Sequence, residues 1–343
     1  MKKVFSIRII FLSTWCILLV GLSPRVYAEG WWQVYFTDPE KNLHGGEYSP
    51  PEQGFIRLID SATRTIDGAF FEIGSKKVAS AFVRAQKRGV RVRLVSDDSN
   101  KKKDGARIVQ KADIPVVFDN KRGLMHNKFA IVDGRYLWTG SYNITDNCAY
   151  HNNNNAILID SPELSLIFED EFEEMFVDKI FENKKERKPL PVLHNPYYVK
   201  IADTNINAYF SPDNDVEDII VKRIKKAKSS IYFLAFSFTS DPIGEAMIAQ
   251  AKKGVMVEGL FEKHGSDSKD SEYNKFRAEG IPVKTDRNPK NMHHKVIIID
   301  EEIVITGSYN FSRNASKRND ENIIIIENSE IAKKYLAEFR HIN

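Results

Sequence analysis

The sequence predicts an α/β fold made of two similar domains, each with a mixed sheet flanked by helices. Similar stretches recur in the same order in both halves, and strand-like and helix-like segments alternate within each half. The stretch 62–71 (ATRTIDGAFF) resembles 227–236 (AKSSIYFLAF), and Ile-Pro-Val at 114–116 recurs at 281–283. The second pair is offset by 281 minus 114, or 167 residues. Because two copies are too few for a solenoid, we expect two packed domains related by a pseudo-two-fold axis.

Each half is expected to run strand, helix, strand, then two strands around a shared motif, and then a closing helix. Apolar residues at helical spacing and a glycine at the end of the run predict the first helix of each half. In the first half these elements are expected at 66–71, 78–87, 90–95 and 163–176. In the second half they are expected at 231–238, 243–253, 255–261 and 330–339.

The first 28 residues have the pattern of a secretory signal peptide. Basic residues precede an apolar run at 9–22, and Val26-Tyr27-Ala28 offers a cleavage site before Glu29. An uncleaved membrane anchor is the alternative. We therefore expect export to the periplasm or to the outside of the cell.

Composition also predicts where the two domains and the linker between them begin and end. Residues 29–182 are expected to form the first domain and residues 200–343 the second. The segment 183–199 carries charges and three prolines without periodicity, which is typical of a linker, and the domain boundary is placed near residue 195.

Net charge and cysteine content bear on whether the protein binds nucleic acid and whether it forms disulfides. The full chain has a formal charge of +3, and removing the four basic residues of positions 1–28 leaves −1. A nucleic-acid-binding protein usually has a clear basic excess, so this chain would depend on local patches. Such patches are Lys101–Lys103, Lys121-Arg122, and Arg287 with Lys290. After cleavage Cys148 would stand alone, so no internal disulfide is expected.

One motif, H-x-K-x4-D followed by T-G-S-Y-N, occurs in both halves. Its members are His126, Lys128, Asp133 and 139–143 in the first half, and His293, Lys295, Asp300 and 306–310 in the second. Residues i and i+2 of a strand share a face, so the His and Lys of each motif project together. Burial and neighbouring positive charge disfavour the charged forms of both, and an anion such as phosphate would relieve this conflict. A single copy could be a His at a strand end beside a solvent-facing Lys, but two copies argue against that interpretation.

These residues resemble the signature of the phospholipase D superfamily, H-x-K-x4-D followed by G-S-x-N. The resemblance covers nearly all of the chain after residue 28. It implies two similar α/β domains whose motifs meet across the interface, in a monomer that carries both. The second half, which ends in Asn319-Asp320-Glu321-Asn322, resembles small endonucleases of the superfamily that dimerise to form the same site.

The resemblance also implies a mechanism without a cofactor. One His attacks phosphorus to form a phosphohistidine, and the other protonates the leaving oxygen and then activates water. By similarity to two-motif relatives, His126 is the expected nucleophile and His293 the acid/base. The residues expected to hold the non-bridging phosphate oxygens are Lys128, Lys295, Asn143 and Asn310, assisted by Ser141 and Ser308. No metal is expected, because adjacent strand residues such as His293 and His294 face opposite ways.

Two further pairs of polar residues occupy matching positions in the two halves. Asp133 and Asp300 are predicted either to take part in catalysis or to be structural residues at a turn. Members of the superfamily place a downstream carboxylate that orients a His, and Glu321 takes that place in the second half. Asn154 stands at the same offset in the first half. An amide cannot stabilise an imidazolium as a carboxylate does, so unequal roles are expected for the two histidines.

The expected function is hydrolysis of a phosphodiester by a phosphoric diester hydrolase of the phospholipase D type, with phospholipid as the substrate and transient contact with a membrane surface. One alternative is a secreted nuclease acting on DNA or RNA, favoured by Lys121, Arg122, Arg287 and Lys290. Another is a binding or toxin-like module without catalysis, against which the two intact motifs argue. A phosphatidyl transferase ranks lower, because such synthases usually carry N-terminal membrane spans. His151 is expected near the site mouth, and Tyr142 and Tyr309 either line the cleft or pack in the core.

Overall fold

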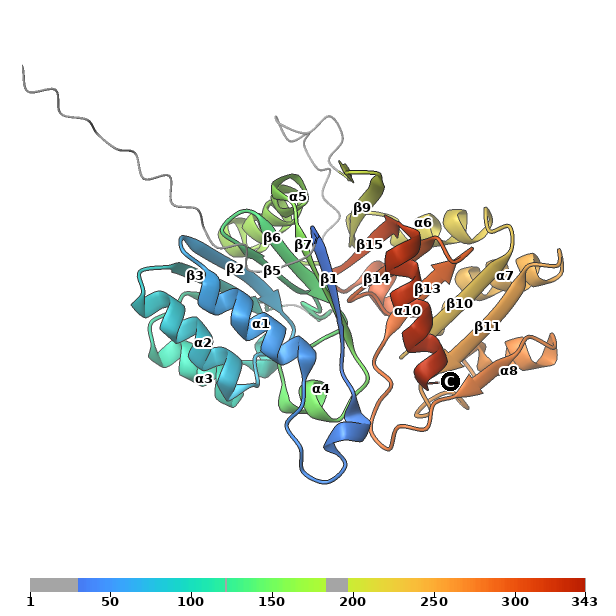
Figure 1. The fold of residues 1–343 in the computed structure, drawn as a ribbon, viewed down its shortest axis with the longest axis horizontal. Coiled ribbons are helices and arrows are strands. Elements are labelled where there is room, and N and C mark those ends of the chain that lie inside the picture. The colour runs from blue at the N-terminus through green and yellow to red at the C-terminus, as the bar shows by residue number, and fades with distance from the viewer. Residues whose placement is uncertain (1–29, 121, 183–196, 343) are drawn as a thin grey trace, which may run out of the picture.

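The computed structural model describes residues 30–120, 122–182 and 197–342 (Figure 1). The predicted signal peptide, Lys121 and residues 183–196 of the predicted linker lie outside the described residues. Within these ranges no helix has both the length and the apolar character needed to cross a bilayer. Cys148 is buried and forms no disulfide with another described residue.

The first half is built on a seven-stranded mixed sheet. Its strand order is β1-β7-β6-β5-β2-β3-β4; β2 pairs in parallel with β3 and β3 with β4, whereas the other pairs are antiparallel. The strands are β1 (Trp32–Phe36), β2 (Thr65–Phe70), β3 (Arg91–Ser96), β4 (Val116–Phe118), β5 (Lys128–Val132), β6 (Tyr136–Gly140) and β7 (Asn155–Asp160). The first motif therefore leads into β5, near the middle of the sheet.

Helices cover both faces of this sheet. The outer face is covered by α1 (Pro50–Ser61), α2 (Lys76–Lys87) and α3 (Asp104–Lys111), and α4 (Asp146–Tyr150) lies at one end (Figure 1). Apolar side chains of α1 and α2, including Phe55 and Phe82, pack with Phe70 and Trp138 of the sheet in one buried cluster. The inner face packs against α5 (Pro162–Glu173), which is followed by a π-helical turn, η3 (Glu174–Asp178).

The second half repeats this architecture in an eight-stranded sheet of order β12-β11-β10-β13-β14-β15-β9-β8. The strands are β8 (Tyr198–Ile201), β9 (Thr204–Ser211), β10 (Ser230–Ala235), β11 (Met256–Phe261), β12 (Val283–Thr285), β13 (Lys295–Ile299), β14 (Ile303–Gly307) and β15 (Glu321–Glu327). The helices are α6 (Val216–Ile224), α7 (Asp241–Ala251), α8 (Glu272–Ala278), α9 (Arg313–Lys317) and α10 (Ser329–Ile342). Apart from β8, the order matches that of the first sheet strand for strand.

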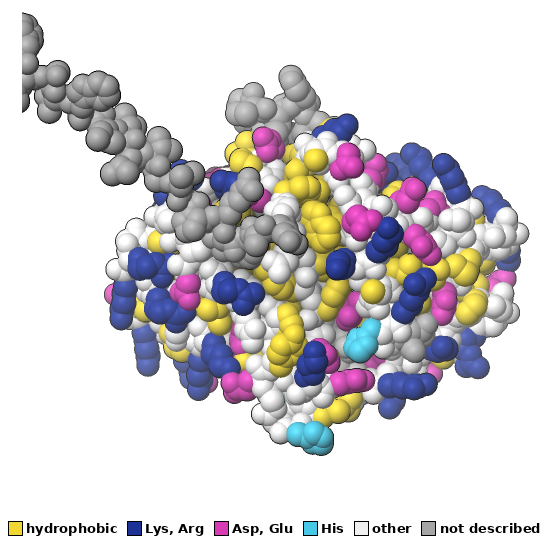
Figure 2. Space-filling view, in the orientation of Figure 1, with side chains coloured by type: hydrophobic (Ala, Val, Ile, Leu, Met, Phe, Trp, Pro, Cys, Tyr) yellow, Lys and Arg dark blue, Asp and Glu magenta, His cyan; other side chains and the backbone are white. Residues whose placement is uncertain are grey.

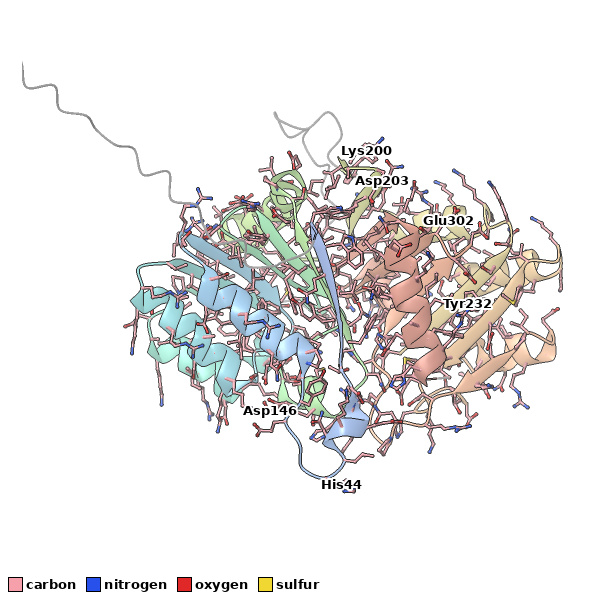
Figure 3. The ribbon with its side chains drawn as sticks, viewed as in Figure 1. His44, Asp146, Lys200, Asp203, Tyr232 and Glu302 are labelled. Carbon is pink, nitrogen blue, oxygen red and sulfur yellow. The ribbon has the colours of Figure 1, made fainter. Side chains whose placement is uncertain are left out.

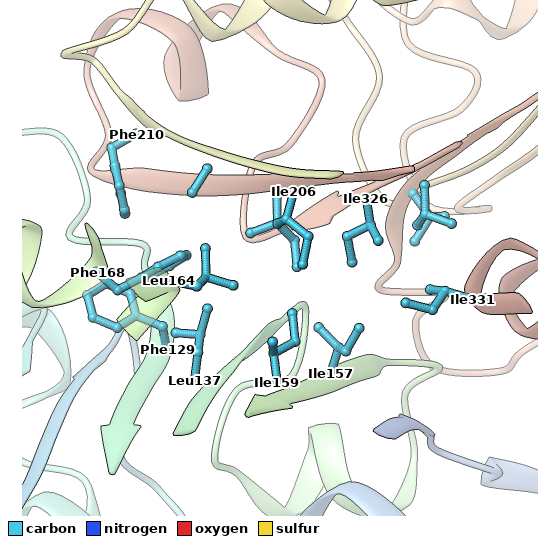
Figure 4. Packing of buried hydrophobic residues seen from close by; sticks show 14 of the residues in the cluster. Phe129, Leu137, Ile157, Ile159, Leu164, Phe168, Ile206, Phe210, Ile326 and Ile331 are labelled. Carbon is cyan, nitrogen blue, oxygen red and sulfur yellow. The ribbon is translucent and has the colours of Figure 1, made fainter. Parts of the chain in front are cut away.

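The two sheets face each other across a shared apolar core that contains α5 and α10 (Figures 1 and 4). The ring of Phe168 on α5 lies 5.1 Å from that of Phe129 on β5 and 4.9 Å from that of Phe210 on β9, both edge-on. Because this single cluster draws residues from both halves, it fixes one sheet relative to the other. The packing thereby fixes the position of the motif strand β5 relative to the motif strand β13.

The structure confirms the predicted fold class of two mixed α/β sheets flanked by helices. The predicted bounds of the elements differ from the observed ones by up to three residues. The strand expected at 231–238 ends at Ala235, because the partner strand β13 begins at Lys295 and supplies no further ladder partner. The helix expected at 163–176 changes to a π-helical turn at Glu174, and β8 begins at Tyr198, two residues before the predicted start of the second domain. Helices α1, α3, α6 and α8 were not predicted from the sequence.

Candidate active site

The two motifs meet at the contact between the halves. The residue before each motif His forms an isolated bridge with the segment that leads into the last strand of the other half, Met125 with Asp320 and Met292 with Asn153. The His126 N–H donates to the Asp320 carbonyl oxygen at 3.0 Å, and the His293 N–H donates to that of Asn153 at 2.8 Å. Both histidines are consequently buried at the interface, and each residue is 7% exposed.

Each imidazole also lies within electrostatic reach of the lysines of both motifs. Burial lowers the pKa of His126, and the charges of Lys128 and Lys295 lower it further against the opposing effect of Glu321. Burial is also the largest cause of the lowered pKa of His293, followed by Lys295, Lys128 and His126. The two motifs therefore form a single site.

Glu321 supports the His of the opposite half. Its Oε2 lies 2.7 Å from Nδ1 of His126, and its other oxygen accepts a hydrogen bond from the Asn319 side chain at 3.2 Å. Glu321 is fully buried, so its carboxylate is held in this position. A carboxylate accepts the Nδ1 proton, and the neutral ring then carries no proton on Nε2. The sequence indicated that Glu321 orients a His, and the structure identifies that His as His126.

His293 has a neutral partner instead. Its Nδ1 lies 2.9 Å from Oδ1 of Asn154 and 3.2 Å from the Ser141 carbonyl oxygen. The Asn154 amide nitrogen donates to the carbonyl oxygens of Cys148 and Asn152, at 3.1 and 3.4 Å, which fixes the amide with its oxygen toward His293. His293 must therefore donate from Nδ1, and its neutral form also has an unprotonated Nε2.

The two motif lysines are buried cations without a carboxylate partner. Lys128 and Lys295 are 1% and 2% exposed, and their Nζ atoms donate to the carbonyl oxygens of His126 and His293 at 2.7 and 2.8 Å. Neither forms an ion pair with a residue in the described ranges. Burial lowers the pKa of Lys128 to about 8 and that of Lys295 well below its ordinary value. Glu321, Asp97 and Glu72 act on Lys128, and Glu321 and Glu262 act on Lys295, but these carboxylates do not offset the cost of burial. The site therefore favours a bound anion.

The predicted phosphate ligands divide into two kinds. The side-chain oxygens of Asn143 and Asn310 are buried without a hydrogen-bond partner among the described residues, so each amide can turn its NH2 group toward an anion. The hydroxyls of Ser141 and Ser308 instead accept the backbone N–H groups of Asn155 and Asn322, at 3.0 and 2.9 Å. These two bonds hold the strand starts that carry Asn154 and Glu321; phosphate binding by the two serines stays a prediction.

Two phenylalanines complete the walls of the site. The ring centroid of Phe71 lies 5.0 Å from that of His126, and the ring centroid of Phe236 lies 4.5 Å from that of His293. Nζ of the motif lysine lies 5.3 Å from the centroid of Phe71 and 4.6 Å from that of Phe236. Sequence reasoning missed both residues, although each ends the repeated stretch 62–71 or 227–236. Tyr142 and Tyr309 are 1% exposed, so they belong to the core and not to the cleft.

The middle residue of each H-x-K motif points away from the site, as strand alternation predicts. Asn127 accepts a hydrogen bond from the Asn322 amide at 2.8 Å, and Nδ1 of His294 lies 3.0 Å from the Asn155 amide nitrogen. Nε2 of His294 lies 3.3 Å from the carboxylate of Glu338. These buried contacts join the halves directly behind the catalytic histidines.

Asp133 and Asp300 have the contacts of structural turn residues, the second of the two alternatives that the sequence allowed. The Asp133 carboxylate accepts backbone N–H groups from 63–65, and the Asp300 carboxylate accepts those of 228–230. Both residues have a positive φ, 57° and 55°. Each Asp thereby ties the end of its motif strand to the start of the neighbouring strand.

In the described part of the chain, two groups of three carboxylates lie close enough together to hold a metal ion. They are Asp97, Asp98 and Asp119, and Glu171, Glu174 and Asp213. Neither set contains His126 or His293. Metal-independent chemistry at the two histidines stays a prediction.

A sequence model described as "Cardiolipin synthase, PLD-like domain" matches the chain twice, at residues 55–176 and 220–343. The chain belongs to the phospholipase D superfamily. Each match contains one complete H-x-K-x4-D motif, so the duplication seen in the structure is a duplication of this superfamily's domain. As a member of the superfamily, the protein is a phosphodiesterase-type enzyme.

Curated relatives agree with this membership. A protein named phospholipase D from Rickettsia bellii is 33% identical over 162 residues, which cover 47% of this chain and 81% of the relative. A mitochondrial cardiolipin hydrolase from Chlamydomonas reinhardtii is 35% identical over 135 residues, which cover 38% of this chain and 60% of the relative. The phosphatidylserine synthase of Haemophilus influenzae superposes with a TM-score of 0.67 at 12% identity, covering 90% of this chain and 86% of its own. At this low identity, the superposition on the synthase supports the two-domain fold alone.

The contacts of Asp133 predict a loss of stability without a loss of catalysis. Burial alone would raise the pKa of Asp133, but the N–H donors of Thr65, Thr63 and Arg64 outweigh it, and the net pKa is lowered. The contribution is therefore present above the ordinary pKa of 3.8 and declines as pH falls below it. Replacing Asp133 with Ala should lower the free energy of unfolding by about 1–2 kcal/mol at pH 7.

Urea denaturation at pH 7 and at pH 3 measures this change, and Asp300→Ala is the matched variant in the second half. Turnover per folded molecule should stay within about twofold of wild type. Unchanged stability combined with lost turnover would assign the two aspartates to catalysis.

The lowered pKa values of the two lysines predict an alkaline limit on substrate capture. Lys128, with a pKa of about 8, loses its charge in the free protein as pH rises through that value. With a phosphodiester that has no titratable group of its own, kcat/KM should fall above about pH 8. A bound anion raises the pKa of the lysine again, so kcat should fall only at higher pH. In the variant Lys128→Arg the side chain keeps its charge, so the fall in kcat/KM should move to higher pH. An unchanged pH profile would show that Lys128 does not set the alkaline limit.

Proposed function

We propose that the protein hydrolyses phospholipid phosphodiesters without a metal, through a covalent phosphohistidine. The observation that carries this proposal is one buried site in which two imidazoles and two lysine ammonium groups lie together, with neither lysine in an ion pair with a described residue. A phosphodiester carries one negative charge and accepts several hydrogen bonds. It therefore balances the excess charge of the site and supplies acceptors for the lysine and asparagine side chains.

The partners of the histidines support His126 as the nucleophile. As its Nε2 bonds to phosphorus, the ring becomes positively charged, and the carboxylate of Glu321 stabilises that charge through Nδ1–H. In the same step the P–O bond to the leaving group breaks and Nε2–H of His293 gives its proton to the leaving oxygen. In the second step His293 takes a proton from water, the hydroxide attacks phosphorus, and the P–N bond to His126 breaks.

The amide partner of His293 suits the acid/base role. Asn154 holds the ring through Nδ1–H but does not stabilise the imidazolium as a carboxylate would, so the ring releases its proton more readily. The empty site disfavours the protonated ring, because burial and the lysines lower the pKa of His293. A bound phosphodiester anion offsets that positive potential and allows His293 to carry the proton that the first step requires.

Several observations support phospholipid over nucleic acid. Relatives aligned with the chain are named phospholipase D and cardiolipin hydrolase. On the face shown in Figure 2, Lys and Arg side chains are spread over both halves among Asp and Glu and form no continuous stripe. The nuclease alternative is favoured by exposed Arg122, Arg287 and Lys290. Both motifs lie in one chain, so we propose an exported monomer that contacts membrane surfaces transiently.

Trapping the covalent intermediate tests the roles of the two histidines. A p-nitrophenyl phosphodiester has a leaving group that needs little protonation, so His293→Ala should still form the intermediate but should fail to activate water. We expect a burst of p-nitrophenol and a mass increase on the peptide that contains His126. His126→Ala should show neither; an adduct on His293 would reverse the two roles.

Substrate class is tested by side-by-side assays of the purified protein in EDTA. Phosphatidylglycerol vesicles should yield phosphatidic acid at the same rate with and without EDTA, whereas plasmid and single-stranded DNA should stay intact. His126→Ala and His293→Ala should each reduce the lipid rate by at least about 10⁴-fold. Cleavage of DNA with intact lipid would favour the nuclease, and loss of lipid activity in EDTA would contradict the metal-independent mechanism.

A further inference from the structure

A chain of buried hydrogen bonds runs from His293 into the contact between the halves. Its first link is the side-chain oxygen of Asn154, which lies 2.9 Å from Nδ1 of His293. The same oxygen accepts the Ser141 hydroxyl at 3.2 Å. That hydroxyl in turn accepts the backbone and the side-chain N–H groups of Asn155, at 3.0 and 3.4 Å. Asn154, Ser141 and Asn155 are fully buried, so each bond depends on protein partners.

The amide of Asn155 determines which nitrogen of His294 carries the proton. Its oxygen accepts the hydroxyls of Thr306 and Tyr335, at 2.9 and 3.2 Å, so its NH2 group faces Nδ1 of His294 at 3.0 Å. An NH2 group can only donate, so Nδ1 accepts and the ring proton lies on Nε2. Nε2–H points to the carboxylate of Glu338 at 3.3 Å. The neutral ring of His294, which is fully buried, thus has a partner for each nitrogen.

Glu338 lies on α10, and packing fixes this helix on two sides. Figure 3 shows α10 beside β1, with Tyr232 on the other side of the helix. The ring of Tyr232 lies 5.3 Å from that of Phe339, and the ring of Phe36 on β1 lies 5.3 Å from that of Tyr335, edge-on. The carboxylate is therefore held at the end of the hydrogen-bond chain.

The equivalent chain behind His126 has a different end. Asn127 takes the place of His294, at an offset of 294 minus 127, or 167 residues. Its side-chain oxygen accepts the NH2 group of Asn322 at 2.8 Å, and its own NH2 group lies 3.9 Å from the sulfur of Met175. The first half thus supplies the same kind of acceptor from an amide, whereas the second half supplies it from an imidazole that a carboxylate holds.

We propose that His294 is a positioning residue for His293. Its Nδ1 holds the NH2 group of Asn155, and the bonds of the chain carry this constraint to the oxygen that orients the ring of His293. Without that acceptor a buried NH2 group is left unpaired, which is costly, so the amide turns and the chain breaks. The inference rests on the proposed function, in which His293 protonates the leaving oxygen and then activates water.

The two chemical steps of a p-nitrophenyl phosphodiester separate this role from a general loss of structure. Release of p-nitrophenol in the first turnover reports formation of the intermediate, which needs little protonation of the leaving group. The slower steady-state release reports hydrolysis of the intermediate, which needs His293 as a base. In His294→Leu, which removes the acceptor, the steady-state rate should fall about tenfold or more, while the first step stays within about threefold of wild type.

His294→Asn is the conservative variant, because an amide oxygen at this position supplies the acceptor that Asn127 supplies in the first half. It should restore the steady-state rate to within about threefold of wild type. Asn127→Leu is the matched control, since it removes the acceptor behind His126 and should slow the first step more than the second. Circular dichroism and urea denaturation check that each variant is folded.

A second pair of variants tests the role where His294→Leu does not fold. In Glu338→Leu the ring proton is free to move to Nδ1, where it meets the NH2 group of Asn155 and breaks the same bond. This variant should also slow the second step selectively, whereas Glu338→Gln keeps an oxygen acceptor for Nε2–H and should not.

Unchanged rates in His294→Leu, equal slowing of both steps, or no recovery in His294→Asn would overturn the positioning role. The same outcomes in the Glu338 pair would overturn it where His294→Leu does not fold. The proposed function fails separately, when wild type releases no p-nitrophenol or carries its adduct on a residue other than His126.

Discussion

The arrangement of the site depends on two lysine ammonium groups buried side by side without carboxylates of their own. Burial of one unpaired cation is costly, and burial of two in one place is tolerated only where the fold is strongly fixed and an anion is expected. The shared core between the sheets supplies that fixation, because α5, α10 and strands from both halves pack in a single cluster. The polar contacts of Asn127 and His294 add a second layer directly behind the histidines. The positive site is thus a property of the whole interface, and neither half alone can form it.

The crossed support of the histidines follows from the same interface. The last strand of each half begins beside the motif of the other half, so Glu321 contacts His126 and Asn154 contacts His293. The backbone repeats almost residue for residue, whereas the side chains at these two positions do not. A carboxylate on one side and an amide on the other give the imidazoles different proton affinities in a nearly symmetric frame.

Much of the fold and the membership of the site could be predicted from the sequence, because both depend on local periodicity and on a repeated motif. His126, Lys128, His293 and Lys295 lie within electrostatic reach of one another, whereas phosphate binding by Asn143 and Asn310 stays a prediction. The histidine served by Glu321 could not be predicted, since that contact joins residues 195 positions apart and depends on the packing of two sheets. Phe71 and Phe236 were missed because an aromatic residue at a strand end is equally common in a core. Asp133 remained ambiguous until its hydrogen bonds to the neighbouring loop were seen, because motif spacing does not distinguish a turn residue from a catalytic one.

Fusion of two motif domains in one chain has a physical consequence for this chemistry. In a symmetric dimer of identical chains, a two-fold axis gives both histidines the same partner and both sides the same cavity. The nucleophile and the acid are then distinguished only by the way the substrate binds. In this chain Asn154 and Glu321 are separate positions, so the two histidines have different partners. Each histidine can therefore be adjusted for one role.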